Sequence, residues 1–571
     1  MKILLVAVNA KYIHSSLALR SIAAYNAEYA DLIELREYTI NNDMSRVTAD
    51  IFKRDPDVVG ISCYIWNYSY VRKITGELKK VRPDLPIWLG GPEVSFDAED
   101  FLTDNRHITG IVRGEGEATW KDLISAYAKG RPELKDIPGI TFRQGETILR
   151  CRDREPIDLN EIPLCYESVG DFDNRIIYYE GSRGCPFRCS YCLSSADCRL
   201  RFKTIEKIKK EISFFVEKGV PLVKFTDRTF NCNHSYTKEI WKYISEIDRG
   251  ETSFHFEIAA DLLDEEEIDI ISQMREGLIR LEIGIQTTNT KTLEAIHRTM
   301  DFHQVARNVK AINEAGTVHQ HLDLIAGLPY EDYESFTRSY DEVYALRPQQ
   351  LQLGFLKVLK GSEMYERREE FGIRYMPEPP YEVLQTADIG YAELLKIKLV
   401  EEMTEVYHNS RQFEKTLLLL ETEYDSPFKM FLELGEYYEK KDLLDINHSR
   451  MARYEILRDF IRDKGFERTA LFDEAMIFDL YLRENLKSRP EWGGERGDYA
   501  RFYTDERLAE VLPAYEGYSP KQVMRMTHIE HFSVDFTHWN NTADFDTGEA
   551  DILFDYKSRS KTDNSARIVK V

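Results

Sequence analysis

Apolar stretches of strand length alternate with amphipathic stretches of helix length at the start of the chain. The apolar runs are 2–8, 32–38, 58–64, 86–91 and 108–114, and the helix-like stretches are 16–29, 70–83 and 117–130. Such alternation predicts a parallel sheet with helices on both faces, because each helix must carry the chain back to the same edge. We therefore expect a doubly wound, Rossmann-like α/β domain over residues 1–135.

A second series of the same kind follows a short irregular region. Its six candidate strands are 175–181, 220–227, 253–260, 278–285, 319–327 and 350–359, again with helix-like stretches between them. Six strand–helix units predict a partial (β/α)6 barrel over residues 175–375, and the chemistry of such a barrel lies at the carboxyl ends of its strands. The intervening residues 136–174 are rich in turns and strand-like runs, so we interpret them as a hairpin and a linker.

The pattern changes beyond residue 375. Long helical stretches cover 381–410, 413–424 and 449–465, and the last part of the chain, 526–539 and 550–561, alternates like strands. We expect a mostly helical, mixed α+β domain over residues 376–571, whose function the pattern does not reveal. Its aromatic and histidine-containing stretch 528–539 is interpreted as part of a sheet core rather than as a substrate-facing surface.

Composition narrows the class of protein. The chain has 571 residues, of which 43% are apolar and 31% are charged, and its first apolar run is too short for a secretory signal. Since no apolar run approaches about 20 residues, we expect no membrane span. The net charge of −23 argues against a broad nucleic-acid-binding surface. We therefore expect a soluble, cytoplasmic protein.

Three cysteines lie in SRGCPFRCSYC, residues 182–192, with the spacing C-x3-C-x2-C. In a long chain with few other cysteines, such a cluster points to a metal or to catalysis rather than to disulfides. A structural zinc site needs four ligands, and Cys198 could supply the fourth. A four-iron cluster on three thiolates instead keeps one iron open, which is a place to bind another molecule.

The segment CPFRCSYC resembles the signature loop of the radical S-adenosylmethionine (SAM) enzymes, and the resemblance covers roughly residues 170–375. It implies that Cys185, Cys189 and Cys192 hold a [4Fe-4S] cluster whose open iron binds SAM. Reductive cleavage of SAM would then yield a 5′-deoxyadenosyl radical, with electrons from an external donor such as a flavodoxin or a ferredoxin.

Further SAM contacts follow from the same resemblance. KFTDRTFN resembles the family's second-strand segment, FHFEIAAD carries a carboxylate where the family has a ribose-binding polar residue, and GIQTTN resembles a later strand motif. The implied SAM contacts are Tyr191, Thr226, Asp227, Arg228, Glu257 and Gln286. The alternatives are a capped strand–helix loop at 226–228 and a buried, paired carboxylate at 257.

The first domain is similar to the cobalamin-binding module of the cobalamin-dependent radical SAM enzymes, through NAKYIHSSLAL and LGGPE. The resemblance places the lower face of the corrin over SCYIWN, residues 62–67, and the nucleotide tail along glycine-containing loops. The implied cobalamin contacts are Ser62, Trp66, Asn67, Gly90, Gly91, Gly114 and Glu115. The alternatives are tight turns at the glycines and core packing of Trp66.

His14 lies where cobalamin proteins of another type carry a D-x-H-x-x-G loop with a cobalt-binding histidine. The loop here reads YIHSSL, so the aspartate and the glycine are absent. Because the usual hydrogen-bonded support of a ligating histidine is missing, a polar or capping role near the corrin is favoured. The similar stretch DFHQVA, 301–306, lies in a helical segment and is interpreted as coincidence.

Together these resemblances imply a cobalamin-dependent radical SAM methyltransferase that acts on an unactivated carbon through a 5′-deoxyadenosyl radical and methylcobalamin. The alternatives are a non-methylating rearrangement or cyclisation with the same cofactors, modification of transfer RNA or other RNA, and a non-catalytic cobalamin or cluster sensor. A small molecule, a peptide and a lipid-like molecule all remain open as substrates. No residue of the sequence is assigned as a catalytic acid, base or nucleophile.

Overall fold

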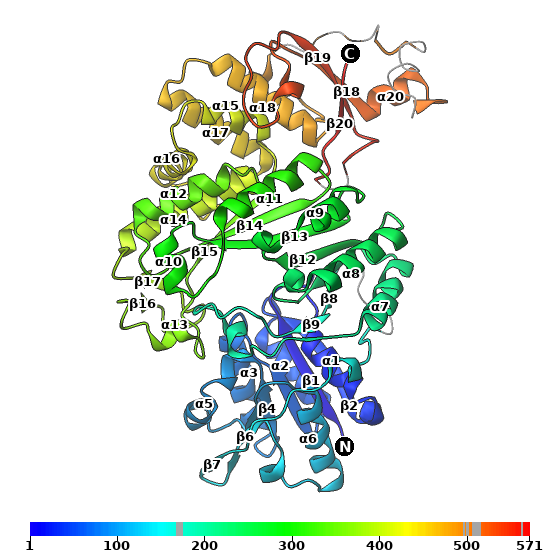
Figure 1. Cartoon of the computed structure of the whole chain (residues 1–571), viewed down its shortest axis with the longest axis vertical. Helices are drawn as coiled ribbons and strands as arrows, with labels where there is room; N and C mark the ends of the chain where they lie inside the picture. The colour runs from blue at the N-terminus through cyan, green and yellow to red at the C-terminus, as the bar shows by residue number, and fades with distance from the viewer. Residues whose placement is uncertain (167–174, 495–496, 498, 500–501, 505–514, 561–562) are drawn as a thin grey trace.

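The computed structural model describes the whole chain except residues 167–174, 495–496, 498, 500–501, 505–514 and 561–562. Three units follow one another along the long axis of the molecule (Figure 1). The first domain, in blue, lies at one end, the second strand–helix series, in green, lies in the middle, and the helical unit lies at the other end. This α/β architecture is the predicted one.

The first domain is built on a seven-stranded sheet of order β2-β1-β3-β4-β5-β6-β7. Its parallel strands are β1 (Ile3–Asn9), β2 (Ile33–Thr39), β3 (Val58–Ser62), β4 (Ile87–Gly90) and β5 (Gly110–Val112). Helices α1 (Leu17–Tyr25) and α6 (Glu117–Lys129) pack on one face, and α2 (Met44–Lys53), α3 (Tyr68–Val81), α4 (Pro92–Ser95) and α5 (Ala98–Asp104) pack on the other. Apolar clusters on both faces explain the unbroken burial of β1 and β3.

The predicted hairpin belongs to this sheet rather than to a linker. Strands β6 (Ile140–Gln144) and β7 (Thr147–Arg150) pair antiparallel with each other, and β6 pairs antiparallel with β5. The expected boundary after residue 135 therefore falls inside a continuous sheet. The physical reason is that β5 would otherwise leave a row of unpaired backbone groups along its edge.

The second unit is an open, parallel barrel of order β8-β11-β12-β13-β14-β15, as predicted. The strands are β8 (Ile177–Tyr179), β11 (Leu222–Phe225), β12 (Ser253–Ile258), β13 (Ile279–Gln286), β14 (His319–Ala326) and β15 (Gln350–Phe355). The outer helices are α7 (Ile205–Glu217), α8 (His234–Ile247), α9 (Glu265–Ser272), α10 (Thr290–Ala295), α11 (Phe302–Ala315) and α12 (Tyr333–Tyr344). Alternate residues of β12, β13 and β14 are buried under these helices, and the others are half-buried on the inner face.

The third unit is mostly helical with one small sheet. Its main elements are α14 (Tyr391–Met403), a π-helical turn (Thr404–Asn409), α15 (Glu414–Glu421), α16 (Pro427–Lys440), α17 (Arg450–Lys464), α18 (Thr469–Arg483), α20 (Pro520–Met526), β18 (Thr527–Phe532), β19 (Ala550–Asp555) and β20 (Arg567–Lys570). The aromatic stretch forms β18, whose Phe532 packs on Phe478 of α18 at 5.5 Å between ring centroids. The sheet-core interpretation is confirmed.

One predicted helix begins later than expected. Within 381–410, strand β17 (Val383–Gln385) pairs with β16 (Arg374–Tyr375), and helix α14 begins only at Tyr391. Gly390, a poor helix former, precedes it and takes an extended conformation. Across the described part of the chain, no helix combines the length and apolar character needed to cross a membrane.

Candidate functional site

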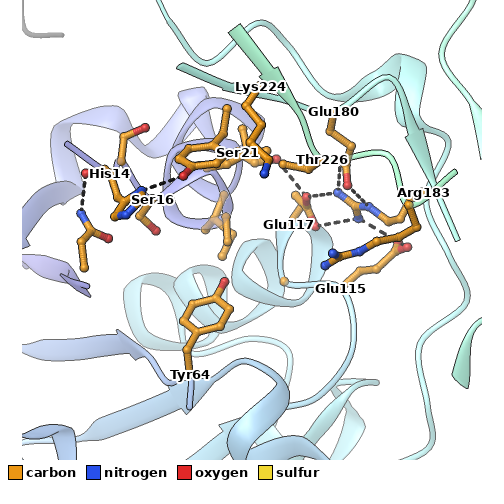
Figure 2. Close-up of a pocket in the computed structure, with 18 of the residues that line it drawn as sticks. His14, Ser16, Ser21, Tyr64, Glu115, Glu117, Glu180, Arg183, Lys224 and Thr226 are labelled. Carbon is orange, nitrogen blue, oxygen red and sulfur yellow. Dashed lines mark hydrogen bonds and ion pairs between the residues drawn. The ribbon is translucent and has the colours of Figure 1, made fainter. Parts of the chain in front are cut away.

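A cavity of about 670 Å³ lies between the first domain and the barrel (Figure 2). The first domain lines it with the loops after β1, β3 and β5 and with the start of α1. The barrel lines it with β8 and with residues at the carboxyl ends of β11 and β12. The ligand-binding edges of two parallel sheets therefore meet at one cavity, which is where each sheet alone would place its ligand.

The loop after β1 is fastened to the first strand of the barrel. The Ile176 amide donates to the Ile13 carbonyl at 2.8 Å, and the Ser15 hydroxyl donates to the Ile176 carbonyl at 3.2 Å. Next to them, His14 Nδ1 lies 2.7 Å from the hydroxyl of Tyr178. These contacts hold the two domains together at the rim of the cavity.

A flat aromatic surface faces the cavity from the first domain. The rings of Tyr64 and Trp66 are stacked, with centroids 4.4 Å apart and planes 6° apart, and Trp66 donates its indole N–H to the Val8 carbonyl at 3.1 Å. Trp66 is nevertheless 44% exposed, so the core-packing interpretation is wrong. An exposed pair of parallel rings in a cavity fits a large planar ligand such as a corrin.

The other predicted cobalamin contacts divide into two groups. Gly114 and Glu115 line the cavity, and Gly114 has φ +70° with open space where a side chain would lie. Ser62, Asn67, Gly90 and Gly91 lie outside the cavity lining.

The latter four residues shape the loops beneath the lining. The buried amide of Asn67 donates to the Val8 carbonyl at 2.9 Å and to the Ser62 carbonyl at 3.0 Å. A side-chain carbon at Gly91 would lie 2.3 Å from the Cys63 carbonyl oxygen. Gly91 of LGGPE therefore allows two loops of the protein to pack closely together. A glycine is needed equally where a ligand approaches the backbone, so the sequence pattern alone does not distinguish the two cases.

The sequence analysis did not predict an ion-pair cluster that lies at the rim of the cavity. Arg183, from strand β9 (Ser182–Arg183), lies 2.9 Å from Glu117, 2.7 Å from Glu180 and 3.4 Å from Glu115 (Figure 2). Burial is the largest influence and raises the pKa of Glu117, but the Arg183 charge, together with the hydrogen bonds from Arg183 and Ser21, leaves that pKa lowered overall. Since Glu115 and Glu117 belong to the first domain, these pairs join the two domains electrostatically.

The three-cysteine loop follows β8, between β9 and its antiparallel partner β10 (Arg201–Phe202). Cys185 and Cys189 are buried, Cys192 is half-buried, and all three thiols are free. The Ser190 amide donates to the Ile296 carbonyl at 2.9 Å, and the Ser190 carbonyl accepts from the Met364 amide at 2.8 Å, which anchors the loop.

The surroundings of the thiols fit an iron–sulfur cluster. The Thr229 hydroxyl lies 3.7 Å from the Cys185 sulfur, and an Arg298 N–H donates to the Cys189 sulfur at 3.7 Å. A cation and hydroxyl beside buried thiols suit thiolates bound to iron. A closed zinc site would bring four sulfurs within about 4 Å of one another, since each lies about 2.3 Å from the metal. In the part of the chain that the structure describes, no three cysteine sulfurs lie within 4.8 Å of one another, so the loop as described does not have the arrangement of a closed zinc site.

Three of the predicted SAM residues line the cavity: Thr226, Arg228 and Glu257. Arg228 lies 3.9 Å from Glu257, and burial raises the pKa of Glu257 to about 7. A half-buried carboxylate whose pKa lies near neutrality and a guanidinium at the mouth of the barrel can bind the hydroxyl and carboxylate groups of a polar ligand.

The other predicted SAM residues lie elsewhere. Asp227 is fully buried, accepts from the Gly181 amide at 2.9 Å and has its pKa raised to about 7 by burial, so it ties β11 to the end of β8. Tyr191 and Gln286 lie near Arg298. Gln286 has φ +73°, and its Oε1 is buried without a hydrogen-bond partner. A strained residue with an orphaned acceptor fits a ligand-binding role.

Polar side chains also line the inner face of the barrel. Glu282 lies 2.8 Å from both Lys224 and His255, and these partners lower its pKa against the opposing effect of burial. In the sequences of β12, β13 and β14, polar residues alternate with the apolar residues of the core. The strand predictions used only the apolar positions, so the polar inner face of the barrel was not predicted. The lumen is thus charged rather than filled by the branched apolar side chains of a closed barrel.

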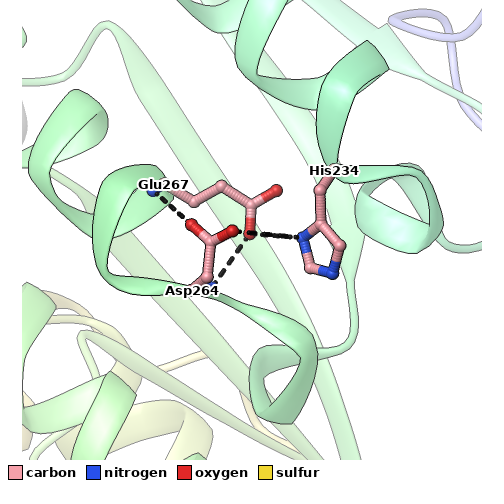
Figure 3. Close-up of side chains that lie close together, drawn as sticks. All are labelled: His234, Asp264 and Glu267. Atoms are coloured by element: carbon pink, nitrogen blue, oxygen red, sulfur yellow. Dashed lines mark hydrogen bonds and ion pairs between the residues drawn. The ribbon is translucent and has the colours of Figure 1, made fainter.

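Figure 3 shows a second polar cluster, on the outer helices α8 and α9. His234 Nδ1 lies 3.0 Å from Glu267, and Asp264 and Glu267 form the capping box of α9. The Lys238 ammonium lies 2.7 Å from Asp264, so a cation already faces the cluster. Helix capping and ion pairing explain these residues without a metal.

Three family models match separate parts of the chain. A B12 binding domain matches residues 3–124, the Radical SAM superfamily matches 179–343, and a protein of unknown function, DUF4080, matches 369–554. The chain is therefore a radical SAM enzyme with an amino-terminal B12-binding domain and a carboxy-terminal domain of unknown function. Its cofactors are a [4Fe-4S] cluster, SAM and cobalamin.

The chain is also similar to curated relatives in sequence and to solved structures in fold. The chain is 25% identical over 525 residues to the cobalamin-dependent radical SAM methyltransferase TokK of Streptomyces tokunonensis, covering 84% of this chain and 76% of TokK. It is 31% identical over 245 residues to an anaerobic magnesium-protoporphyrin IX monomethyl ester cyclase of Synechocystis, covering 40% of this chain and 48% of that enzyme. The solved structure of the cobalamin-dependent SAM radical enzyme OxsB shares the fold, with a TM-score of 0.58 at 14% identity over 83% of this chain and 78% of OxsB.

Proposed function

We propose that this enzyme is a cobalamin-dependent methyltransferase that methylates an unactivated carbon of its substrate. The observation that carries the proposal is the shared cavity, where the aromatic surface of the first domain meets the mouth of the barrel. When bound there, the cofactors supply a SAM-derived radical and a transferable methyl group. The name and extent of the TokK relationship support methyl transfer.

Different residues of the chain bind the cofactors and hold the two domains in place. Cys185, Cys189 and Cys192 hold the cluster, and Arg228 and Glu257 bind polar groups of SAM at the cavity wall. The Arg183 ion pairs keep the domains at a constant separation. Such positioning matters because a misplacement of about 1 Å can cost on the order of 100-fold in rate.

Cyclisation is the second candidate, because the 31% identical relative is named as a cyclase. It uses the same cavity and the same cofactors but transfers no methyl group. The products formed from SAM therefore separate the two candidates.

The test is anaerobic reconstitution with iron, sulfide and hydroxocobalamin, followed by SAM and a low-potential reductant. We expect 5′-deoxyadenosine, S-adenosylhomocysteine and methylated cobalamin. The Cys185→Ala/Cys189→Ala/Cys192→Ala variant should form no 5′-deoxyadenosine. The control Cys198→Ala should form the same products as the wild type, because Cys198 is not a proposed cluster ligand and its thiol donates to the Ser195 carbonyl. Deoxyadenosine without methylated cobalamin would favour cyclisation, and neither product from a cluster-replete wild type would contradict both candidates.

The proposal extends to the partners and the compartment. The substrate is a small molecule, a peptide or a lipid-like molecule, and the electrons come from an external donor such as a flavodoxin or a ferredoxin. All eight cysteines are free, which supports a reducing compartment and hence a cytoplasmic enzyme.

A further inference from the structure

A row of basic side chains crosses the inner face of the barrel. In the register of the strands, Lys224 lies beside His255 at one end of the row. His255 lies beside Arg280, which in turn lies beside His319. Lys224 also lines the shared cavity (Figure 2). Since neighbouring strands lie about 4.8 Å apart, the row extends about 10 Å from Lys224 to Arg280 and about 14 Å to His319.

The carboxylates of the lumen already have other partners. Within the described strands of the barrel, three carboxylates occupy inner positions, and each faces a basic side chain. The pairs are Glu257 with Arg228 at 3.9 Å, Glu282 with Lys224 at 2.8 Å, and Asp323 with His321 at 3.1 Å. Arg280 and His319 belong to none of these pairs.

The side chains of Arg280 and His319 are half-buried, and among the described residues neither one has a hydrogen-bond or ion-pair partner. Burial lowers the pKa of Arg280. Burial, followed by the positive charges of Arg280 and Arg411, lowers the pKa of His319 to about 4. Because arginine stays protonated in proteins, Arg280 carries a half-buried charge without a counter-ion, which is unfavourable until an anion binds.

The third unit adds positive charge at the same end of the row. Arg411 lies between the π-helical turn and α15, and its guanidinium pairs with Glu414. Figure 1 shows this unit on the side of the barrel that faces away from the first domain. The row therefore runs from the shared cavity towards a region where two units contribute cations.

Position along the strands separates Arg280 from the cluster end of the barrel. Arg280 is the second residue of β13, and Gln286, which lies near the cluster-facing Arg298, is the last. Six residues of strand span about 20 Å. The group of SAM that binds the open iron therefore does not reach Arg280, so an anion at Arg280 belongs to another molecule.

We propose that Arg280 and His319 form an anion-binding site in the barrel lumen, which holds a carboxylate or phosphate group of the substrate. The planar fork of an arginine can bind either group through two parallel hydrogen bonds. The assignment to the substrate rests on the proposed function, in which the reacting carbon lies in the shared cavity. The substrate is then an elongated molecule whose anionic group lies about 10 Å along the row from Lys224.

The test uses the full chain and two probes, inorganic phosphate and acetate, each titrated at constant ionic strength against chloride. The melting temperature reports binding, because a ligand that binds only the folded protein stabilises it. We expect at least one probe to raise the melting temperature of the wild type. The probe that binds more tightly identifies the anionic group as a phosphate or a carboxylate.

Variants locate the binding of the tighter probe. Arg280→Met should weaken it about tenfold or more, since a hydrogen bond to a charged group is worth about 1.5–3 kcal/mol. Arg280→Lys, which keeps the charge without the planar fork, should weaken it less. His319→Ala should also weaken it. The control Arg307→Met should not change it, because Arg307 is exposed on the outer helix α11.

The stability without phosphate or acetate gives a second readout. In chloride alone, Arg280→Met should melt at a higher temperature than the wild type, because it removes a half-buried charge that has no counter-ion. An arginine with a purely structural role would give a lower melting temperature. If Arg280→Met does not fold, Arg280→Lys provides the same comparison of probe binding.

Two results would overturn the anion site: no stabilisation of the wild type by either probe, or equal stabilisation of the wild type and Arg280→Met. The reconstitution with SAM tests the proposed function separately. A wild type that forms deoxyadenosine and methylated cobalamin but binds neither probe would contradict the anion site alone. A wild type that binds a probe at Arg280 but forms neither product would contradict the proposed function, and with it the assignment of the anion to the substrate.

Discussion

The guanidinium of Arg298 donates to the sulfur of Cys189 across 3.7 Å, and its second nitrogen donates to the Gly284 carbonyl. Arg298 follows helix α10, more than 100 residues after the cysteine loop. The contact places a positive charge beside one of the three proposed cluster ligands. Hydrogen bonds to the sulfurs and local charge are among the factors that set the reduction potential of an iron–sulfur cluster.

Removal of this charge should make the cluster harder to reduce. We expect Arg298→Met to shift the midpoint potential in the negative direction, by about 40 mV for each 1 kcal/mol of lost preference for the reduced state. A redox titration followed by electron paramagnetic resonance, without SAM, measures the shift. The exposed Arg199, which pairs with Asp197, offers the matched control Arg199→Met. Equal potentials in both variants and the wild type would contradict the electrostatic role.

Loss of the Arg183 charge should destabilise the interface between the domains. Arg183→Met leaves the buried Glu117 without its cation, and breaking a buried pair in this way costs about 3–5 kcal/mol. The double variant Arg183→Met/Glu117→Gln should regain part of the loss, as measured by urea denaturation. Because the pKa of Glu117 is lowered in the folded protein, the pair stabilises the protein above the unfolded pKa, and this contribution disappears as the pH falls through the folded value. A penalty for Arg183→Met that grows on acidification would be inconsistent with this pairing.

Two glycines, in the loops after β4 and β5, should respond differently to a methyl group. Gly91→Ala places a carbon against the Cys63 carbonyl at φ +114°, so we expect a loss of at least about 2 kcal/mol of stability. Gly114→Ala adds its methyl to open space at φ +70° and should cost about 1 kcal/mol. Thermal unfolding of both variants measures the difference between the two losses of stability. A larger loss in Gly114→Ala than in Gly91→Ala would contradict this prediction.

The exposed indole of Trp66 should contribute to cobalamin affinity. Trp66→Ala removes one of two stacked rings, and an aromatic contact of this kind is worth about 1 kcal/mol, or roughly fivefold in dissociation constant. Titration with hydroxocobalamin, read by absorbance after gel filtration, measures the change. Phe52→Ala is the control, because Phe52 is 45% exposed on α2, outside the cavity lining. Equal affinities in the two variants would remove Trp66 from the binding surface.

Glu257 should make the stability of the cofactor-free protein depend on pH. Burial raises its pKa to about 7, above the ordinary value of 4.5, so ionisation favours the unfolded chain. Its contribution to stability is therefore fully present below about pH 4.5 and falls as the pH rises towards 7. The difference in melting temperature between the wild type and Glu257→Gln should grow in favour of the variant from pH 5 to pH 8. A constant difference would show that Glu257 stays ionised throughout.

The local sequence pattern was sufficient to predict the three-part architecture and to identify the cysteine loop. Strands and helices differ in the period of their apolar residues, and the three cysteines lie within eight positions of one another, so both signals are contained in short stretches. The boundary expected after residue 135 falls within the seven-stranded sheet, because β6 pairs with the edge of β5, and such edge pairing depends on where the sheet ends.

Contacts between distant segments required the folded chain. His14 and Tyr178 are 164 positions apart, and the sequence loop suggested a histidine without support, whereas the fold gives it a phenol. In the same way, Asp227 and Arg228 are neighbours in the sequence, but one is buried under β8 and the other faces the cavity. Residue type and spacing specify which elements form. The direction of a side chain, and what it meets, depends on how those elements pack, because packing brings together groups whose sequence separation carries no local signal.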